Sequence, residues 1–534
     1  MPGPISEYLS SLRREYEQGN TTEHSFRPAL KAVIEAMDPN VIATNEPQRR
    51  VDCGAPDISV ARRAGPTIGY VEAKDIGTNL SEAERTEQLQ RYLRSLPNLI
   101  LTDQLEFRWY VDGELRKELR VAHLSARKLR SIPGAETDLE VLLQSFLSHR
   151  PEPIRSPEDL ARRMARLTHL IRDIIVEAFQ TQQASDTLHD LRKAFEEVLI
   201  PDLTLNDFAD MFAQTLAYGL FAARINHKGS DPFERVGAAR DIPKTNPFLR
   251  KLFDTITGVS LDDEPFARFV DDLTYLLANA DMAAILADFG KRTRREDPIV
   301  HFYETFLAAY DPKLREQRGV YYTPMPVVSY IVRSVDHLLR ERFGCQDGLA
   351  DAAVVTYKRE VQRDNCTEVV EEQSHKVLVL DPACGTGTFL YAVIDQIRHQ
   401  FMVRGNAGLW SGYVREHLLP RLFGFELLMA PYAVAHLKLG MQLAGADLPE
   451  EQRAIWAYDF AGDERLGVYL TNALEPGTAG FQQAALLGRY IADEAQAASK
   501  VKSILPVLVI LGNPPYSGHS ANKGSWISQL LRDY

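Results

Sequence analysis

A proline-rich turn near residue 513 combines groups that suit methyl transfer to a poorly nucleophilic nitrogen. Asn513, Pro514, Pro515 and Tyr516 follow directly on the apolar run LPVLVILG. The lone pair of an amide-like or aromatic amine nitrogen is delocalised, so hydrogen-bond acceptors must draw it toward tetrahedral geometry, as the Asn513 side-chain oxygen and the Pro514 carbonyl can do. The two prolines stiffen the turn, and the Tyr516 ring can stack on a planar substrate.

A glycine turn closes a second apolar run, KVLVLDPACGTGTFL. The run ends at Asp381, and the chain then bends through Gly385 and Gly387, where absent side chains let the backbone approach a small nucleotide-like cofactor. Leu390 stands where a dinucleotide fingerprint needs a third glycine. Glu426 ends another run, RLFGFELL, where a carboxylate can accept hydrogen bonds from two ribose hydroxyls. The alternatives are a structural β-turn and a solvated glutamate.

Asp57, Glu72 and Lys74 have the spacing of a metal-dependent hydrolytic site. Asp57 opens one expected strand, and Glu72 and Lys74 share a face of the next strand because they are two residues apart. A hairpin-like return through ARRAGPT can bring Asp57 beside them. Asp57 and Glu72 would then hold Mg²⁺, and Lys74 would orient the attacking water or stabilise charge on phosphorus. The alternative is an ordinary strand with exposed charges.

The first two segments resemble the amino-methylating DNA adenine methyltransferases. The resemblance rests on D-P-A-C-G-T-G-T-F-L at 381–390 and N-P-P-Y at 513–516, preceded by R-G-V-Y-Y-T-P at 318–324. It implies S-adenosylmethionine as cofactor and double-stranded DNA as partner, with an adenine flipped out of the duplex. The cofactor residues that it implies are Thr323 at the methionine carboxylate, Asp381, Ala383, Gly385 and Gly387 at the methionine part, Phe389 in the pocket wall and Glu426 at the ribose.

Two points leave the methyl acceptor and its contacts open. The family usually has an acidic residue at the end of the third strand, where VYLTNALE has Asn472, and Asp459 and Asp463 are other candidates. Protein-glutamine and ribosomal RNA guanine methyltransferases also use turns like N-P-P-Y, so the turn alone does not identify the substrate.

The triad of Asp57, Glu72 and Lys74 resembles that of the PD-(D/E)xK nucleases. Q-L-Q-R-Y at 88–92 matches a Q-x-x-x-Y helix in the restriction-enzyme branch of these nucleases, which adds Gln88 and Tyr92. Glu23 matches an acidic residue that this branch often places near the metal. The whole chain resembles type IIG and type ISP restriction-modification enzymes. Type ISP enzymes carry a helicase between the two activities, and this sequence has no G-x-x-x-x-G-K-[ST] nucleotide-binding motif, which separates it from them.

These resemblances imply a site-specific DNA adenine-N6 methyltransferase fused to a Mg²⁺-dependent endonuclease, in a bacterial or archaeal phage-defence system. One alternative is a methyltransferase with a non-cleaving N-terminal DNA-binding domain, and another is a catalytically silent remnant. A methyltransferase sheet of this class needs about seven strands, and the sequence stops soon after the fourth. We therefore expect an incomplete domain, completed by a missing C-terminal region or a second polypeptide, and poor methylation by this chain alone.

The expected fold is multidomain α/β, and 534 residues suffice for three or four domains. Strand-like runs and an amphipathic helix predict a small α/β or α+β unit over 1–135, which the resemblance implies is nuclease-like. Almost purely helical periodicity predicts a connector over 136–297. Strands alternating with helices predict a doubly wound α/β domain over 298–534, which the resemblance implies is a Rossmann-like methyltransferase domain. The polar segment 351–374 is expected to lie on the surface.

Composition indicates which partners and which cellular compartment to expect for the protein. The net charge of −12 means that DNA contacts must come from local basic clusters. Four dispersed cysteines argue against a disulfide framework, and no run reaches the ~18 apolar residues of a membrane span. We expect a cytoplasmic protein. The basic clusters are Arg49 and Arg50, then Arg116, Lys117, Arg120, Arg127, Lys128 and Arg130, then Lys291, Arg292, Arg294 and Arg295.

Overall fold

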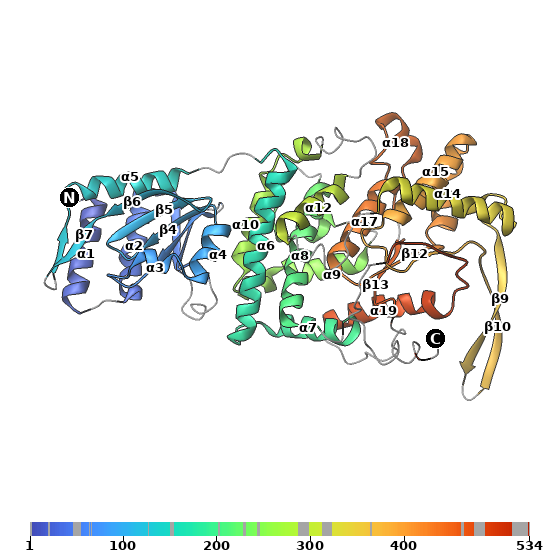
Figure 1. Ribbon diagram of the computed structural model, residues 1–534, viewed down its shortest axis with the longest axis horizontal. Helices are drawn as coiled ribbons and strands as arrows, with labels where there is room; N and C mark the ends of the chain where they lie inside the picture. Colours follow the sequence, from blue (N-terminus) through green and yellow to red (C-terminus); the bar gives the residue numbers. More distant parts are fainter. Residues whose placement is uncertain are drawn as a thin grey trace. The chain divides into compact units, whose positions relative to one another are not determined.

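The chain is mixed α/β and forms two compact units in a computed structural model (Figure 1). Unit 1 comprises Met1–Ala184 and Asp262–Ile285, and unit 2 comprises Ser185–Leu261 and Leu286–Tyr534. The structure describes residues 3–19, 22–45, 55–63, 65, 67–125, 128–149, 154–200, 203–227, 231–242, 246–286, 298–311, 323–363, 366–460, 464–474, 486–514 and 532.

Unit 1 is built on a sheet in the order β1-β2-β3-β4-β5-β6. β2 and β3 pair antiparallel, which confirms the return expected through ARRAGPT, and β3 and β4 are parallel. β7 and β8 form a separate two-stranded hairpin. The strands are β1 (Val41–Asn45), β2 (Ile58–Arg62), β3 (Thr67–Ala73), β4 (Asn98–Thr102), β5 (Glu106–Val111), β6 (Glu114–Arg120), β7 (Ala122–Ser125) and β8 (Lys128–Ser131).

The helices of unit 1 supply much of its apolar core. α1, α2 and α5 contribute Leu12, Ile34 and Phe146 to one cluster with strand residues such as Val60 and Val71. The helices are α1 (Pro4–Glu17), α2 (Glu23–Met37), α3 (Leu80–Ala83), α4 (Glu87–Ser95), α5 (Ala135–Ser148), α6 (Pro157–Gln180) and α10 (Ala267–Ala278). This packing fixes α2 and the β2–β3 pair in one core.

Unit 2 contains a parallel sheet in the order β13-β12-β11-β14. Its strands are β11 (Val379–Asp381), β12 (Leu422–Glu426), β13 (Gly467–Leu470) and β14 (Val509–Ile510). Helices α15 (Thr388–Val403), α17 (Met429–Leu443) and α19 (Leu486–Ser503) lie between successive strands in the sequence. Since parallel strands end at the same edge, the residues after each strand gather there.

Further helices of unit 2 pack against this α/β part. α8 is buried along most of its length and contacts α17, whereas α7 contacts α19. The helical character expected for 136–297 is confirmed in the described residues of that range. These elements are α7 (Asp186–Val198), α8 (Leu205–Asn226), η2 (Ala238–Asp241), α9 (Pro247–Thr257), η3 (Val259–Asp263), α12 (Pro298–Tyr310), α14 (Met325–Arg342), η4 (Gly348–Ala350), η5 (Ala407–Leu409), α16 (Trp410–Tyr413), η6 (Val414–Leu418) and α18 (Glu450–Trp456).

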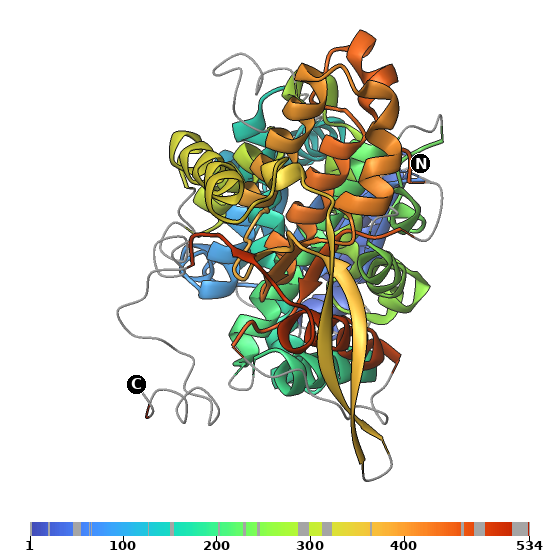
Figure 2. The ribbon, with the colours of Figure 1, turned by 90° about the vertical axis from the view of Figure 1, so that its right-hand side faces the viewer.

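The polar segment before β11 forms a long hairpin on the surface of unit 2. β9 (Val354–Arg363) and β10 (Cys366–His375) pair antiparallel along their whole length. Figures 1 and 2 show the hairpin extending away from the helices of this unit. The expectation of a surface excursion is thus confirmed, and the excursion is regular β-structure because its valines and threonines favour strands.

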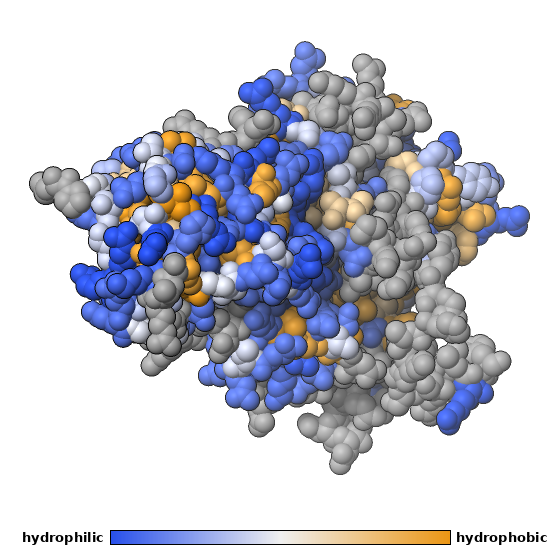
Figure 3. Space-filling view, turned by 60° about the vertical axis from the view of Figure 1, so that its left-hand side comes forward, coloured by the Kyte–Doolittle hydropathy of each residue, from blue (hydrophilic) through white to orange (hydrophobic). Residues whose placement is uncertain are grey.

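The surface in view is mainly hydrophilic. In Figure 3, apolar residues form small groups among polar ones. Among the described residues, none of the helices is both long and apolar enough to span a bilayer.

Candidate active sites

The glycine turn joins β11 to α15 at the carboxyl edge of the parallel sheet. Gly385 and Gly387 have φ of 53° and 76°, values that favour glycine. An added Cβ at Gly387 would lie 3.3 Å from the Ala435 Cβ on α17, whereas one at Gly385 would meet nothing within 4 Å. Gly387 therefore allows close helix packing, and Gly385 leaves open space for a ligand beside the turn.

Asp381 is buried beneath this turn, with 1% of its surface exposed. Its Oδ1 accepts a hydrogen bond from the Ala383 N–H at 3.2 Å, and its Oδ2 has no hydrogen-bond partner among the described residues. Burial, helped by the nearby charge of Glu426, raises the pKa of Asp381 to about 7, although the Ala383 hydrogen bond opposes the shift. Two acidic groups therefore face one small region, where a cationic ligand would relieve their repulsion.

Glu426 ends β12 and ties the glycine turn to the next strand. Its Oε2 accepts a hydrogen bond from the Gly385 N–H at 2.9 Å, and its Oε1 accepts from the N–H groups of Leu427 and Leu428. Burial raises the pKa of Glu426. The sequence pattern did not reveal this positioning role. A carboxylate has about four acceptor sites, and these three bonds leave about one for a further hydrogen bond to a ribose hydroxyl. The side chain of Phe389, in the first turn of α15, is buried.

The Asn513 corner lies next to the glycine turn. β14 pairs with β11, and the Leu511 N–H donates to the Leu380 carbonyl at 3.0 Å. A Cβ at Gly512 would lie 2.4 Å from Asp381 Oδ1, so only glycine allows this approach without a shift. Asn513 Nδ2 donates to the Thr323 hydroxyl at 2.9 Å. Pro514 is exposed, and Pro515 and Tyr516 lie outside the described residues.

Asn472 lies just after β13, at the same edge, but its side chain is engaged within the protein. Its Nδ2 donates to the Leu199 carbonyl at 3.4 Å, and its Oδ1 accepts from the Leu474 N–H at 3.0 Å. Lys502 Nζ contacts the Asn472 carbonyl at 2.6 Å, which fixes the end of the strand. Of the alternative acidic candidates, Asp459 is exposed and Asp463 lies outside the described residues.

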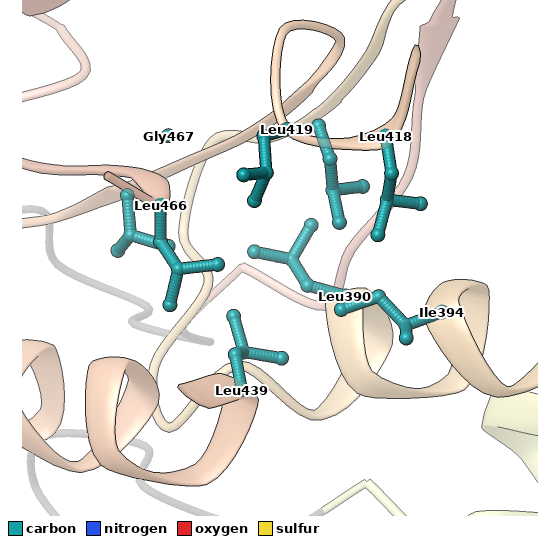
Figure 4. Close-up of a pocket in the computed structure, with 9 residues that line it drawn as sticks. Leu390, Ile394, Leu418, Leu419, Leu439, Leu466 and Gly467 are labelled. Carbon is teal, nitrogen blue, oxygen red and sulfur yellow. The ribbon is translucent and has the colours of Figure 1, made fainter. Parts of the chain in front are cut away.

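An apolar cavity in unit 2 is separate from these groups. In Figure 4 the side chains of Leu390, Ile394, Leu418, Leu439 and Leu466 surround it. Its volume is about 10 Å³, which is at most the space of one water molecule. This cavity is a packing gap, because it is too small for a cofactor and lacks polar side chains.

In unit 1, Asp57, Glu72 and Lys74 come together at the ends of β2 and β3. The antiparallel register pairs Ile58 with Val71, so its continuation places Asp57 opposite Glu72. Asp57 Oδ2 accepts from the Ala73 N–H at 2.7 Å, and Lys74 Nζ lies 2.6 Å from Glu72 Oε1. Both carboxylates are buried.

Helix α4 adds Gln88 and Tyr92 to this group. Gln88 Nε2 donates to the Tyr92 hydroxyl at 3.0 Å. Burial raises the pKa of Tyr92 well above its usual value, and the charges of Glu72 and Asp57 raise it too. The side chain of Glu23 is outside the described part of the structure.

Arg27 is a buried member of this site that the sequence did not reveal. It lies on α2, and its guanidinium forms an ion pair with Asp57 Oδ1. The only sequence signal was an arginine one helical turn after Glu23. Within the described residues, no group of three or more His, Cys, Asp or Glu side chains could hold a metal ion. Two carboxylates nevertheless suit Mg²⁺, which is usually bound by one or two carboxylates, water and substrate phosphates.

The basic clusters differ in how far their charges are neutralised. Arg116 pairs with Glu114, and Arg120 pairs with Glu106. Lys128 and Arg130 on β8 are exposed. The remaining residues named in the clusters, apart from Lys117, lie outside the described parts: Arg49, Arg50, Arg127, Lys291, Arg292, Arg294 and Arg295.

Comparisons with known proteins identify similar solved structures only. No family model and no curated protein matches the chain, whereas 15 chains of solved structures match. One is a cryoEM structure of a DrdV–DNA complex, with 21% identity, coverage of 97% of this chain and 44% of that chain, and a TM-score of 0.40. Another is a nuclease-deletion mutant of the type ISP restriction-modification enzyme LlaGI in complex with a DNA substrate mimic. It has 17% identity, coverage of 73% of this chain and 26% of that chain, and a TM-score of 0.43.

A third is the ATP-dependent type ISP restriction-modification enzyme LlaBIII bound to DNA, with 18% identity, coverage of 75% of this chain and 24% of that chain, and a TM-score of 0.44. The matching structures thus include restriction-modification enzymes in complex with DNA. This chain spans less than half the length of each of these three proteins.

Proposed function

We propose that this chain carries a DNA adenine-N6 methyltransferase, which uses S-adenosylmethionine, and a Mg²⁺-dependent DNA endonuclease of a restriction-modification system. One observation carries the methyltransferase part. Asp381 ends β11 and Asn513 follows the neighbouring parallel strand β14, and Gly512 lies against the Asp381 carboxyl. The buried acidic side chain that would face a cationic donor is thereby adjacent to a corner of hydrogen-bond acceptors.

The residues of unit 2 suit this reaction. S-adenosylmethionine, when bound by Asp381, Gly385 and Glu426, supplies a methyl group on a positively charged sulfur. The Asn513 side-chain oxygen and the Pro514 carbonyl would accept hydrogen bonds from the adenine amino group and polarise its nitrogen. The bond from Asn513 Nδ2 to Thr323 uses the amide N–H and so fixes which end of the amide is the acceptor. Tyr516 would stack on the flipped base.

The residues of unit 1 suit phosphodiester hydrolysis. Asp57 and Glu72 would hold Mg²⁺, which stabilises negative charge on the phosphate. Lys74, already 2.6 Å from Glu72, would orient the attacking water. Gln88 and Tyr92 would position the carboxylates from α4. Arg27 forms an ion pair with Asp57, which would also suit an N-terminal domain that binds DNA without cutting it. The experiment therefore measures methylation and cleavage separately.

The test measures both activities in the gene as it occurs in its host. For methylation, host DNA is sequenced for N6-methyladenine with the wild-type gene, with Asn513→Ala and with Asn226→Ala, a control residue whose side chain donates to the Ala222 carbonyl within α8. We expect a methylated DNA motif that is lost, by roughly 100-fold or more, with Asn513→Ala alone. Persistent methylation with Asn513→Ala would refute the proposed role of the corner.

For cleavage, phage restriction is compared between wild type, Glu72→Gln and the exposed control Glu118→Gln. We expect restriction to be lost with Glu72→Gln while the methylated motif remains. Unchanged restriction with Glu72→Gln would favour the alternative in which the N-terminal domain binds DNA without cutting it.

A further inference from the structure

Two buried carboxylates of the candidate nuclease site have cationic side chains of the same chain beside them. Arg27 pairs with Asp57, and Lys74 pairs with Glu72. Lys74 belongs to the proposed hydrolytic site, whereas nothing in the proposed function requires Arg27. Its side chain is nevertheless buried, with 4% of the residue exposed. A buried arginine at this position therefore needs its own explanation.

Electrostatics supplies one. A carboxylate removed from water is strongly destabilised unless a positive charge lies beside it. A bound Mg²⁺ would supply this positive charge beside Asp57. In the absence of metal, another cation must supply it. Asp57 Oδ2 accepts the Ala73 N–H, and Oδ1 is the oxygen that Arg27 contacts. A metal ion that binds Oδ1 therefore meets the guanidinium at the same atom, where two positive charges repel each other.

We propose that Arg27 is the internal counter-ion of the metal-free nuclease site and competes with the divalent cation for Asp57. This inference rests on the proposed nuclease function and adds a residue that controls its metal affinity. Arg27 stabilises the empty site, keeps Asp57 in place and makes metal binding weaker than the two carboxylates alone would make it. Arg27 is thus a positioning residue that metal binding displaces from Asp57.

The test measures Mn²⁺ binding to the full chain by calorimetry, without DNA. We expect Arg27→Met to bind Mn²⁺ at least about ten-fold more tightly than wild type, because one nearby positive charge is removed. The same variant should melt at a lower temperature without metal and gain more thermal stability from Mn²⁺. Arg27→Gln keeps a hydrogen-bond donor for Asp57, so it serves where Arg27→Met folds poorly. Arg62→Met removes a different arginine, paired with Asp38, and should leave Mn²⁺ affinity unchanged.

The outcomes separate the inference from the proposed function. Equal or weaker Mn²⁺ binding by both Arg27 variants, while wild type binds Mn²⁺ through Asp57, would overturn the inference and leave the nuclease proposal standing. Asp57→Asn should abolish binding in wild type and in Arg27→Met alike. Absence of Mn²⁺ binding in wild type and in both Arg27 variants would overturn the metal-dependent nuclease and the inference with it.

Discussion

At the scale of single residues, Asp381 combines burial with a pKa of about 7, far above that of an exposed aspartate. Between pH 4 and 7 the folded chain therefore holds a proton on this carboxyl that the unfolded chain has released. Its contribution to the free energy of unfolding is present at low pH and is lost as the pH rises through 7. Above pH 7 the ionised Asp381 carboxylate therefore lowers the free energy of unfolding, while it places a negative charge beside the proposed cofactor.

We predict that S-adenosylmethionine binds wild type more tightly at pH 8 than at pH 6, by up to about ten-fold, because the cationic ligand favours the ionised carboxylate. Asp381→Asn should bind it weakly at both pH values. The same variant should raise the melting temperature of the ligand-free chain at pH 8. Calorimetric titrations and melting curves at the two pH values check both effects, and an unchanged pH dependence in Asp381→Asn would contradict this role.

Local sequence was enough to predict some of these residues but not others. The glycine turn and Asn513 lie in short motifs whose backbone demands are local, and the structure places them side by side. The contact of Arg27 with Asp57 joins residues 30 positions apart, and no motif marks it. The engagement of Asn472 by Leu199 spans 273 positions and depends on how the helices pack, which periodicity does not specify.

At the scale of elements, the β7–β8 hairpin separates charge from apolar surface. The register pairs His123 with Arg130, and Lys128 lies two residues before Arg130, so these three side chains share one face. Leu129 on the other face joins the core of unit 1. Leu124 lies near Gly77, in the loop that follows Lys74, since a Cβ at Gly77 would be 3.5 Å from it. The basic face is therefore held close to the loop that leaves the proposed nuclease site.

We predict that this basic face contacts DNA phosphates. The double change Lys128→Glu and Arg130→Glu should weaken DNA binding and reduce the slope of log affinity against log salt by about 2, since each phosphate contact contributes about 0.9. Fluorescence anisotropy with a DNA duplex at several salt concentrations measures this. Lys193→Glu with Arg415→Glu, on the exposed surface of unit 2, is the charge-matched control. A slope that matches wild type in the β8 variant would contradict the prediction.

At the scale of the whole molecule, the two units are not consecutive in sequence. The chain leaves unit 1 after Ala184, returns for Asp262–Ile285 and then completes unit 2. The returning segment carries Asp272, which hydrogen-bonds the buried Tyr70 of β3, and Phe269, which stacks on the Tyr70 ring. A protein cut after residue 184 would therefore lack part of the packing around the strand that carries Glu72.

We predict that the intact chain unfolds in two calorimetric transitions, one for each unit. S-adenosylmethionine should raise only the transition of unit 2, and Mn²⁺ only that of unit 1. A ligand at 100 times its Kd adds about 2.7 kcal/mol to the stability of the unit that binds it. Differential scanning calorimetry with each ligand checks this, and a single transition shifted by both ligands would show that the units unfold together.

If the chain has the proposed pair of activities, the close approach at Gly512 affects the survival of the host cell. Any side chain there collides with Asp381 Oδ1, so Gly512→Ala should disable chromosome protection while the nuclease residues stay intact. Cells given this allele would then cut their own genome. Transformation should yield very few colonies with Gly512→Ala and normal numbers when Glu72→Gln is added. Normal colony numbers with Gly512→Ala alone, in cells that still restrict phage, would show that the chain tolerates a methyl group at this point.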